Sequence, residues 1–142
     1  MTTAANRGKE AEDLVRAFLT KRSAKASTSF YRLPDARAGS RQPTLADFLL
    51  FNKGVGYLLE VKQVDHEYRL PHNNFDTGQV ARMRLFEQAG AVPIVLVYHT
   101  PIRLWRANFV SRFIDRDGGS WDLRGQEAMT LDEAFISVNV LF

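Results

Sequence analysis

Residues 45–63 read LADFLLFNKGVGYLLEVKQ. The first seven residues are apolar apart from Asp47, a polar Asn-Lys-Gly turn follows, and the remainder alternates between two kinds of side chain. This pattern predicts two antiparallel strands joined as a hairpin. Because successive side chains of a strand point to opposite faces, Glu60 and Lys62 share one face while Leu59 and Val61 share the other. The expected strands are residues 45–51 and 55–63, and the expected turn is 52–54.

The segments on either side of this hairpin supply helices and further strands. Apolar residues recur at helical spacing in residues 7–22, and a second helical pattern begins after Asp76 or Thr77 and stops at Gly90. Residues 92–98 are a nearly unbroken apolar run, as expected of a central strand covered on both faces. The order of elements predicts an α/β fold with a mixed β-sheet flanked by helices. Strands are also expected at residues 28–33 and, on an edge, at 102–106, with a turn-rich loop at 34–43 and a polar stretch at 65–74.

Each helix has an apolar face that predicts its buried side, and each carries a polar residue beside that face. In the first helix Glu12 lies on the flank of the apolar stripe, and in the second Gln79 falls on the side of Met83 and Phe86. A carboxylate beside a core-facing stripe needs a partner, because burying an unpaired charge is costly. The residues expected to face the core are Ala11, Leu14, Val15, Phe18 and Leu19 in the first helix and Val80, Met83 and Phe86 in the second.

Length and composition limit the class of protein. With 142 residues, 45% of them hydrophobic, we expect a single domain with a core at about residues 6–106 and a C-terminal extension, 107–142, of unclear role. The absence of cysteine excludes a disulfide framework, a thiolate nucleophile and cysteine-based metal sites. No apolar run approaches the roughly 20 residues that span a bilayer, and no signal peptide is apparent, so we expect a soluble, cytoplasmic protein.

The net charge of +3 is modest but unevenly distributed. Residues 1–45 contain nine Lys and Arg against four Asp and Glu, whereas the remaining residues contain ten against twelve. Such asymmetry suits a polyanionic partner, because each phosphate neutralised by Lys or Arg releases condensed counterions. A solvated basic face explains the same numbers, so charge alone leaves both interpretations open.

Three acids and a lysine stand where the pattern otherwise calls for apolar side chains. They are Glu12, Asp47, Glu60 and Lys62. Buried charges are costly unless they are paired or bind a metal. If the two strands pair as a hairpin, Asp47 and Glu60 converge on one divalent cation, and a backbone carbonyl near Val61, waters and phosphate oxygens could complete an octahedron. Oxygen ligands favour Mg²⁺ or Mn²⁺.

The remaining residues of this set have supporting roles in such a site. Lys62 would lie beside the metal, where an ammonium orients an attacking water and offsets charge on the transition state. Glu12 would bind a second metal or a metal-bound water, and Gln79 would assist in a similar way. Glu-x-Lys alone is a weak signal, since it usually marks a solvated strand face with a surface ion pair. The combination with Asp47 on the preceding strand is much rarer. For this set of residues alone, a nuclease site and a solvated strand face are about equally well supported.

The segment NRGKEAE, residues 6–12, is similar to the Asn-Arg-Gly opening of RecU-type bacterial Holliday junction resolvases, in which a glutamate follows the glycine by four residues. The thirteen-residue step from Asp47 to Glu60, followed by Lys62, also resembles that family. Archaeal Hjc-type resolvases have a related helix and a related Asp, Glu-x-Lys core. Ala46 stands where the wider PD-(D/E)XK nuclease class carries its proline. A fourth similar segment contains Asn74, Phe75, Gln79 and Met83.

The resemblance covers roughly residues 6–98 and implies a restriction-endonuclease-like core with the order αβββαβ. It implies a homodimeric, structure-selective DNA endonuclease that resolves four-way junctions by paired, Mg²⁺-dependent phosphodiester hydrolysis. Branched DNA is the implied partner, and Mn²⁺ is expected to substitute for Mg²⁺. The implied catalytic residues are Glu12, Asp47, Glu60, Lys62 and Gln79, with metal ligands from Asp47, Glu60, Glu12 and Val61.

Contacts to DNA outside the metal site are expected from basic residues that flank it: Arg7, Lys9, Arg37 and Arg41. No sequence-reading module is recognisable, so recognition of DNA shape and charge is expected. Three alternatives stay open. One is another PD-(D/E)XK nuclease, for instance a flap, repair or restriction-like enzyme. Another is a non-catalytic DNA-binding protein of the same fold, and the plainest is a soluble α/β interaction domain in which Glu60 and Lys62 form a surface pair.

We expect mainly structural roles for the histidines and tryptophans. His66, His72 and His99 form no zinc-binding spacing, and most lone histidines are surface or structural residues. His66 and His72 follow the strand that carries Glu60, so a phosphate contact is the minority alternative for them. Trp105 and Trp121 are expected to pack in the core rather than stack on bases.

Overall fold

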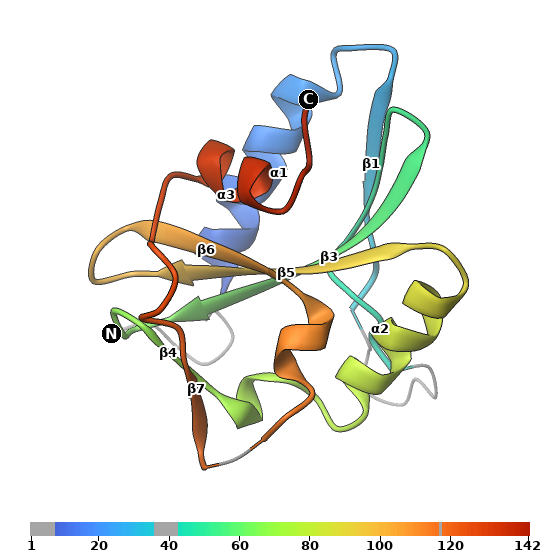
Figure 1. Ribbon diagram of the computed structural model, residues 1–142. Coiled ribbons are helices and arrows are strands. Elements are labelled where there is room, and N and C mark those ends of the chain that lie inside the picture. Colours follow the sequence, from blue (N-terminus) through green and yellow to red (C-terminus); the bar gives the residue numbers. More distant parts are fainter. Residues whose placement is uncertain (1–7, 36–42, 117) are drawn as a thin grey trace.

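The computed structural model describes residues 8–35, 43–116 and 118–142, and its main feature is a five-stranded sheet (Figure 1). Its strands are β1 (Thr28–Arg32), β2 (Phe48–Asn52), β3 (Val55–Val64), β5 (Val92–His99) and β6 (Leu104–Phe109). The strand order is β1-β2-β3-β5-β6, with β3 and β5 parallel and every other neighbouring pair antiparallel. The sheet is therefore mixed, as the sequence predicts.

Helices cover both faces of this sheet. On one face lie α1 (Lys9–Arg22) and α3 (Leu131–Ser137), side by side in Figure 1. On the other face lie α2 (Gln79–Gln88) and a small antiparallel sheet of β4 (Arg69–Pro71) and β7 (Ser120–Asp122). Within the described residues, no helix is both long and apolar enough to cross a membrane.

The two faces of the sheet carry two hydrophobic cores. The side chains of β5 alternate between them: Ile94 and Leu96 belong to the core under α1 and α3, while Val95 and Val97 belong to the core under α2. The second core also includes residues of the 3-10 helix η3 (Val110–Phe113). This coverage on both faces is what the unbroken apolar run of β5 predicts.

The β2–β3 hairpin forms as its sequence predicts. Asn52 pairs with Val55, which leaves Lys53 and Gly54 as the turn residues, with φ of 52° and 82°. Two positive φ values define the hairpin turn whose twist matches that of the flanking strands, and glycine adopts this conformation without strain. A turn of two residues fixes the register of the whole hairpin.

The predicted faces of both helices need correction at one position each. Leu14 and Phe86 were expected in the core but are 42% and 47% exposed. Helical periodicity marks a face, but it does not tell how far the sheet extends beneath that face. The N-cap of α2 is Gly78, at φ 81°, rather than Asp76 or Thr77, because a left-handed residue ends the preceding turn there.

Element boundaries also shift. Asp47 lies one residue before β2 rather than inside a strand, and the edge strand β6 begins two residues later than expected. The polar stretch at 65–74 contains β4 and the 3-10 helix η2 (His72–Asn74), which its composition does not reveal. The helix α2 ends at Gln88, just before the expected stop. These shifts leave the order of the main elements unchanged.

The C-terminal residues pack onto the sheet. A capping box starts α3: the Thr130 hydroxyl accepts the Glu133 N–H, and the Glu133 carboxylate accepts the Thr130 N–H. Phe135 of this helix is fully buried, and the backbone of Met129 pairs with that of Trp105. The segment whose role the sequence left open thus supplies part of the first core.

Candidate active site

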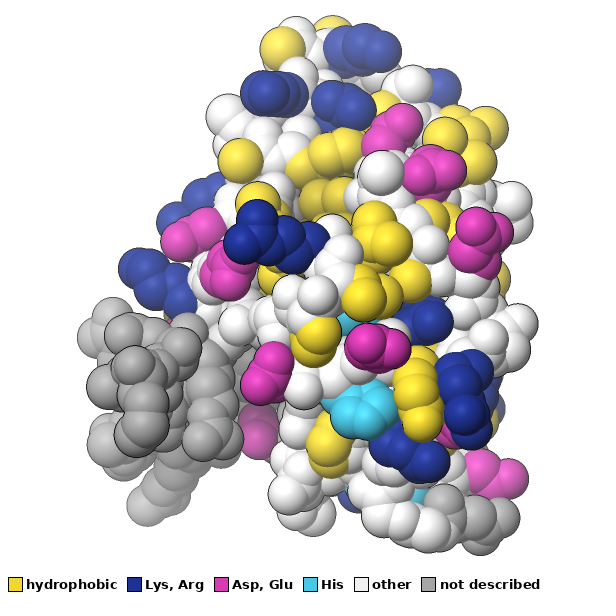
Figure 2. Space-filling view, turned by 90° about the vertical axis from the view of Figure 1, so that its left-hand side faces the viewer, with side chains coloured by type: hydrophobic (Ala, Val, Ile, Leu, Met, Phe, Trp, Pro, Cys, Tyr) yellow, Lys and Arg dark blue, Asp and Glu magenta, His cyan; other side chains and the backbone are white. Residues whose placement is uncertain are grey.

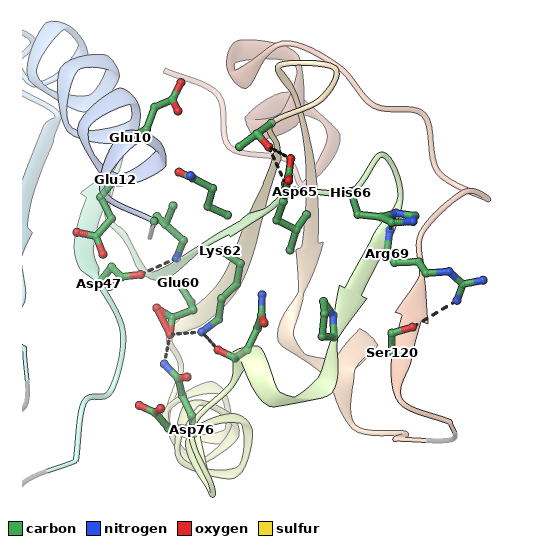
Figure 3. A pocket seen from close by; sticks show the side chains of 18 of the residues that line it. Glu10, Glu12, Asp47, Glu60, Lys62, Asp65, His66, Arg69, Asp76 and Ser120 are labelled. Atoms are coloured by element: carbon green, nitrogen blue, oxygen red, sulfur yellow. Dashed lines mark hydrogen bonds and ion pairs between the residues drawn. The ribbon is translucent and has the colours of Figure 1, made fainter. Parts of the chain in front are cut away.

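A cavity of about 1110 Å³ lies between the first turn of α1, the end of β3, α2 and the β4–β7 sheet (Figure 3). Its lining joins residues that are far apart in the sequence. The six residues singled out for catalysis and metal binding all line it: Glu12, Asp47, Glu60, Val61, Lys62 and Gln79.

The hairpin register places Asp47 beside Glu60. Phe48 pairs with Leu59 in the antiparallel hairpin, so the next pair is Asp47 and Glu60. The side chains of this next pair lie on the other face of the sheet from those of Phe48 and Leu59. The Asp47 Oδ2 accepts the Val61 N–H at 2.7 Å, which fixes the orientation of its carboxylate. Asp47 is 6% exposed and Glu60 is 3% exposed. Two buried carboxylates side by side repel one another when both are charged, so each disfavours the charged form of the other.

The surroundings of Glu60 disfavour its charged form. Burial raises the pKa of Glu60 well above its usual value, and the nearby Asp47 carboxylate raises it further. The Lys62 Nζ lies 3.7 Å from Glu60 Oε2 and acts in the opposite direction, since a cation favours the carboxylate. The Gln79 amide donates a hydrogen bond to the same oxygen. A bound cation would favour the charged carboxylate at this position.

Lys62 is held at its ammonium by the short segment before α2. Its ammonium donates to the backbone oxygen of Asn74 and lies 4.6 Å from the ring centroid of Phe75. Asn74 and Phe75 belong to the short connection before α2 that carries the family resemblance. This packing positions the ammonium beside Glu60 rather than in solvent.

Glu12 reaches the cavity from the first turn of α1. Gly8, at φ 85°, caps the helix in a left-handed conformation that glycine adopts without strain. The Ala11 N–H donates to the Gln63 side chain on β3 at 3.0 Å, which ties the helix start to the sheet. Burial, and then the Asp47 carboxylate, raise the pKa of Glu12. The glycine-to-glutamate spacing thus delivers a third carboxylate to the site.

Arg32 at the end of β1 is a residue of the site that the sequence did not reveal. Its guanidinium contacts the carboxylates of Glu12 at 3.0 Å, Asp35 at 2.9 Å and Asp47 at 3.6 Å. These acids come from a helix, a loop and a strand start. Arg32 therefore compensates part of the negative charge, and no local pattern around it predicts this role.

Gln79 lines the cavity, and its two side-chain atoms differ in their partners. Its Nε2 lies between two acceptors, Glu60 Oε2 and the Leu45 carbonyl at 3.4 Å, which assigns the amide orientation. Its Oε1 is buried and has no partner among the described residues. A buried amide oxygen without a partner costs free energy unless water or a ligand donates to it.

The donor set fits a divalent cation. Among the described residues, no three His, Asp or Glu side chains are grouped closely enough to hold a metal ion by themselves. Mg²⁺ is nevertheless usually bound by one or two carboxylates, with waters and substrate phosphates as the other ligands. Asp47 and Glu60 supply those carboxylates, and Glu12 lies beyond Asp47. Their mutual repulsion would be relieved by a cation, and the free Gln79 oxygen suits a metal-bound water.

The expected DNA contacts are mostly untested by the structure. Arg7, Arg37 and Arg41 lie outside the described residues. Lys9 is exposed in the first turn of α1, between Gly8 and Glu10, which both line the cavity. A contact from Lys9 to DNA stays a prediction.

The mixed sheet with helices on both faces matches the restriction-endonuclease-like fold that the sequence predicts, as superposition on solved structures shows. The chain superposes on Hjc from Archaeoglobus fulgidus, a Holliday junction resolvase from an archaeal hyperthermophile, with a TM-score of 0.64 and 19% identity, over 92% of this chain and 99% of that one. It also superposes on the bacterial homing endonuclease I-Ssp6803I with a TM-score of 0.53 and 14% identity, over 86% and 78% of the two chains. No family model and no curated protein matches the sequence.

Proposed function

We propose that the protein is a metal-dependent DNA endonuclease that cuts four-way junctions. The observation that supports this most is the convergence of Asp47, Glu60 and Lys62 in one cavity, on a fold shared with a junction resolvase. Glu12 and Gln79 join them from two helices. A buried anionic cluster of this kind is a poor structural device but a good ligand set for Mg²⁺ or Mn²⁺.

Each residue of the site has a role that follows from its position. Asp47 and Glu60 would hold a divalent cation, which when bound polarises the phosphate and lowers the pKa of water. Lys62, fixed by Asn74, would offset the negative charge that develops on the phosphate. The Gln79 Oε1 would accept a hydrogen bond from the attacking water and so orient it.

Paired cuts across a junction require two such sites. A symmetric dimer presents two identical cavities related by a twofold axis, which matches the pseudo-twofold symmetry of a four-way junction. The dimer is part of the proposal, because the sequence motifs resemble a dimeric family and Hjc shares the fold.

Cleavage of a labelled, immobile four-way junction tests the proposal. Wild-type protein should cut the junction symmetrically with Mg²⁺ and leave it intact with EDTA, while a linear duplex stays uncut. Asp47→Asn should abolish cleavage but keep binding, because asparagine retains an oxygen for the Val61 N–H and loses only the charged metal ligand. Asp13→Asn, on the exposed side of α1, is the matched control and should cut like wild type.

Cleavage by Asp47→Asn near the wild-type rate would overturn the assignment of the site. Binding of wild-type protein without any metal-dependent cut would instead support a non-catalytic DNA-binding protein of the same fold.

A second candidate is a nuclease of the same fold with another DNA substrate. The likeness to the homing endonuclease I-Ssp6803I is the observation in its favour. Comparing cleavage rates on a four-way junction, a flap, a nicked duplex and a linear duplex separates the two. Equal rates on all four would retain the nuclease and remove the junction preference.

A further inference from the structure

The cavity extends beyond the acidic site to the small β4–β7 sheet. Arg69 and Pro71 on β4 line its far end together with Gly119 and Ser120. The two strands pair antiparallel, with Pro71 opposite Ser120. In Figure 3, Arg69 and Ser120 lie on the side of the cavity opposite Asp47 and the first turn of α1. One continuous space thus connects the acids with this second sheet.

The charge of the cavity makes its far end important for an anionic substrate. Among the described lining residues are seven acids and two cations, Lys62 and Arg69. A DNA strand that enters this cavity meets strong repulsion unless cations lie along its path. Lys62 is next to the proposed metal position, so among the lining residues that the structure describes, Arg69 is the cation for the rest of the path. The acids are Glu10, Glu12, Asp35, Asp47, Glu60, Asp65 and Asp76.

Arg69 is exposed, and among the described residues it forms no ion pair within 4.0 Å. Its Nη1 lies 3.3 Å from the Ser120 hydroxyl, and its guanidinium lies 5.4 Å from the centroid of the Tyr68 ring. Asp122, its partner across the strands, is near enough for the Arg69 charge to help lower the pKa of that carboxyl, but its close ion pair is with another arginine. In contrast, Arg124 on the same surface pairs with Asp122 at 2.7 Å. A planar guanidinium with a neutral hydroxyl beside it can bind a phosphate through two parallel hydrogen bonds.

His66 supplies a second donor at the same place. Its Nδ1 accepts the backbone N–H groups of Tyr68 and Arg69, at 3.2 and 3.0 Å. In the neutral ring the proton is therefore on Nε2, so this nitrogen is a donor. His66 lines the cavity, and its ring contacts that of Tyr68 edge to face at 4.6 Å. Figure 2 shows one face of the molecule, on which a histidine side chain (cyan) lies next to hydrophobic (yellow) and basic (dark blue) side chains.

The position of these donors is fixed by the core beneath them. Leu70 of β4 and Trp121 of β7 are buried in the core under α2. The buried Arg106 donates to the Glu67 carbonyl at 2.8 Å, which anchors the connection from β3 to β4. A donor group on a fixed strand pair is preorganised, so binding loses little conformational entropy.

We propose that the β4–β7 sheet carries a second DNA subsite, in which Arg69, with His66 beside it, binds a backbone phosphate of the strand being cut. The scissile phosphate lies at Asp47 and Glu60, and the Arg69 phosphate lies further along the same strand. The subsite rests on the proposed nuclease function, since it takes DNA as the ligand of the cavity. It would position the strand and carry no sequence information.

Salt-dependent binding tests this subsite without any cleavage. Affinity for a labelled four-way junction and for a linear duplex is measured across a salt series, with Ca²⁺ in place of Mg²⁺. Each phosphate contact contributes about 0.9 to the slope of log affinity against log salt. Arg69→Ala should therefore lower the slope by about 0.9 and weaken binding. Arg16→Ala, an exposed arginine on α1 away from the cavity, is the matched control and should match wild type.

A charge-retaining variant and modified DNA locate the contact. Arg69→Lys should keep the slope, because a lysine still neutralises one phosphate. Replacing single phosphates by neutral methylphosphonates should reveal one position near the cut that weakens wild-type binding and has no further effect on Arg69→Ala. If Arg69→Ala and Arg16→Ala give the same slope, or if the position still matters in Arg69→Ala, the subsite is wrong.

Failure of the nuclease proposal has a different signature. Wild-type protein would then bind DNA and cut nothing in Mg²⁺, while the slope difference between Arg69→Ala and Arg16→Ala would still be measured. Normal Mg²⁺-dependent cutting together with equal slopes would overturn the subsite alone.

Discussion

Acidification from pH 7.5 to 5 should destabilise the protein by about 2 kcal/mol through His99 alone. His99 is fully buried at the end of β5. Its Nδ1 lies 2.8 Å from the His66 carbonyl, and its Nε2 lies 3.0 Å from Arg106 Nη1. Since a carbonyl only accepts and a guanidinium only donates, the ring is the neutral tautomer with its proton on Nδ1. A second proton on Nε2 would face the Arg106 cation.

The magnitude follows from the pKa of this ring. Burial lowers the pKa of His99 from 6.5 to about 4, and the Arg106 charge adds to the effect. The unfolded chain therefore takes up a proton below pH 6.5, whereas the folded protein does not until about pH 4, so stability falls as pH falls through that window. The free energy of unfolding falls by about 1.36 kcal/mol for each pH unit below the pKa of 6.5 in the unfolded chain, which amounts to about 2 kcal/mol at pH 5.

Urea unfolding at both pH values measures the effect. His99→Gln removes the titrating group and keeps an oxygen that can accept from Arg106, so the variant should lose about 2 kcal/mol less than wild type on acidification. The comparison with the variant is needed because Glu60 acts with the opposite sign. Its raised pKa means that the folded protein takes up a proton first, which adds stability as pH falls. Equal losses for wild type and His99→Gln would refute the reasoning.

Two further predictions concern the metal site. Arg32→Ala should lower the Mg²⁺ concentration that gives half-maximal cleavage, because Arg32 competes with the cation for Glu12 and Asp47; an unchanged or higher concentration, read from an Mg²⁺ titration of cleavage rate, would contradict this. At limiting Mg²⁺, cleavage should decrease as pH falls, since burial raises the pKa of Glu60 and a proton then excludes the metal. Excess Mg²⁺ should shift this decrease to lower pH, and a pH–rate profile that does not respond to Mg²⁺ would argue against Glu60 as a ligand.

The part of the site that the sequence predicted depends on short-range geometry. Asp47, Glu60 and Lys62 lie on one hairpin, whose two-residue turn fixes which residues face each other. Gly8 and Glu12 are separated by about one helical turn. Positions of this kind can be derived from strand alternation, turn length and helical spacing. The family resemblance then connected the separate segments.

The part that was missed depends on contacts between distant segments. Arg69 meets Ser120 only because β4 pairs with β7, and the two residues are 51 positions apart. Strands of three residues carry too little periodicity to be recognised in a polar stretch. Arg32 likewise depends on three acids from three different elements. Long-range pairing of short strands is the information that one sequence does not provide.

The negative charge of the site is compensated only in part within the protein. Three carboxylates lie in or beside a buried position, and burial raises the pKa of two of them, Glu12 and Glu60. Arg32 and Lys62 compensate this charge only in part, and an uncompensated buried carboxylate destabilises a fold. A divalent cation would neutralise the remainder and a DNA phosphate would complete its ligands. On this reasoning the metal-free protein has an unfavourable electrostatic energy, which the binding of the cation and of DNA together relieves. The cation and DNA together should therefore stabilise the folded protein more than either does alone.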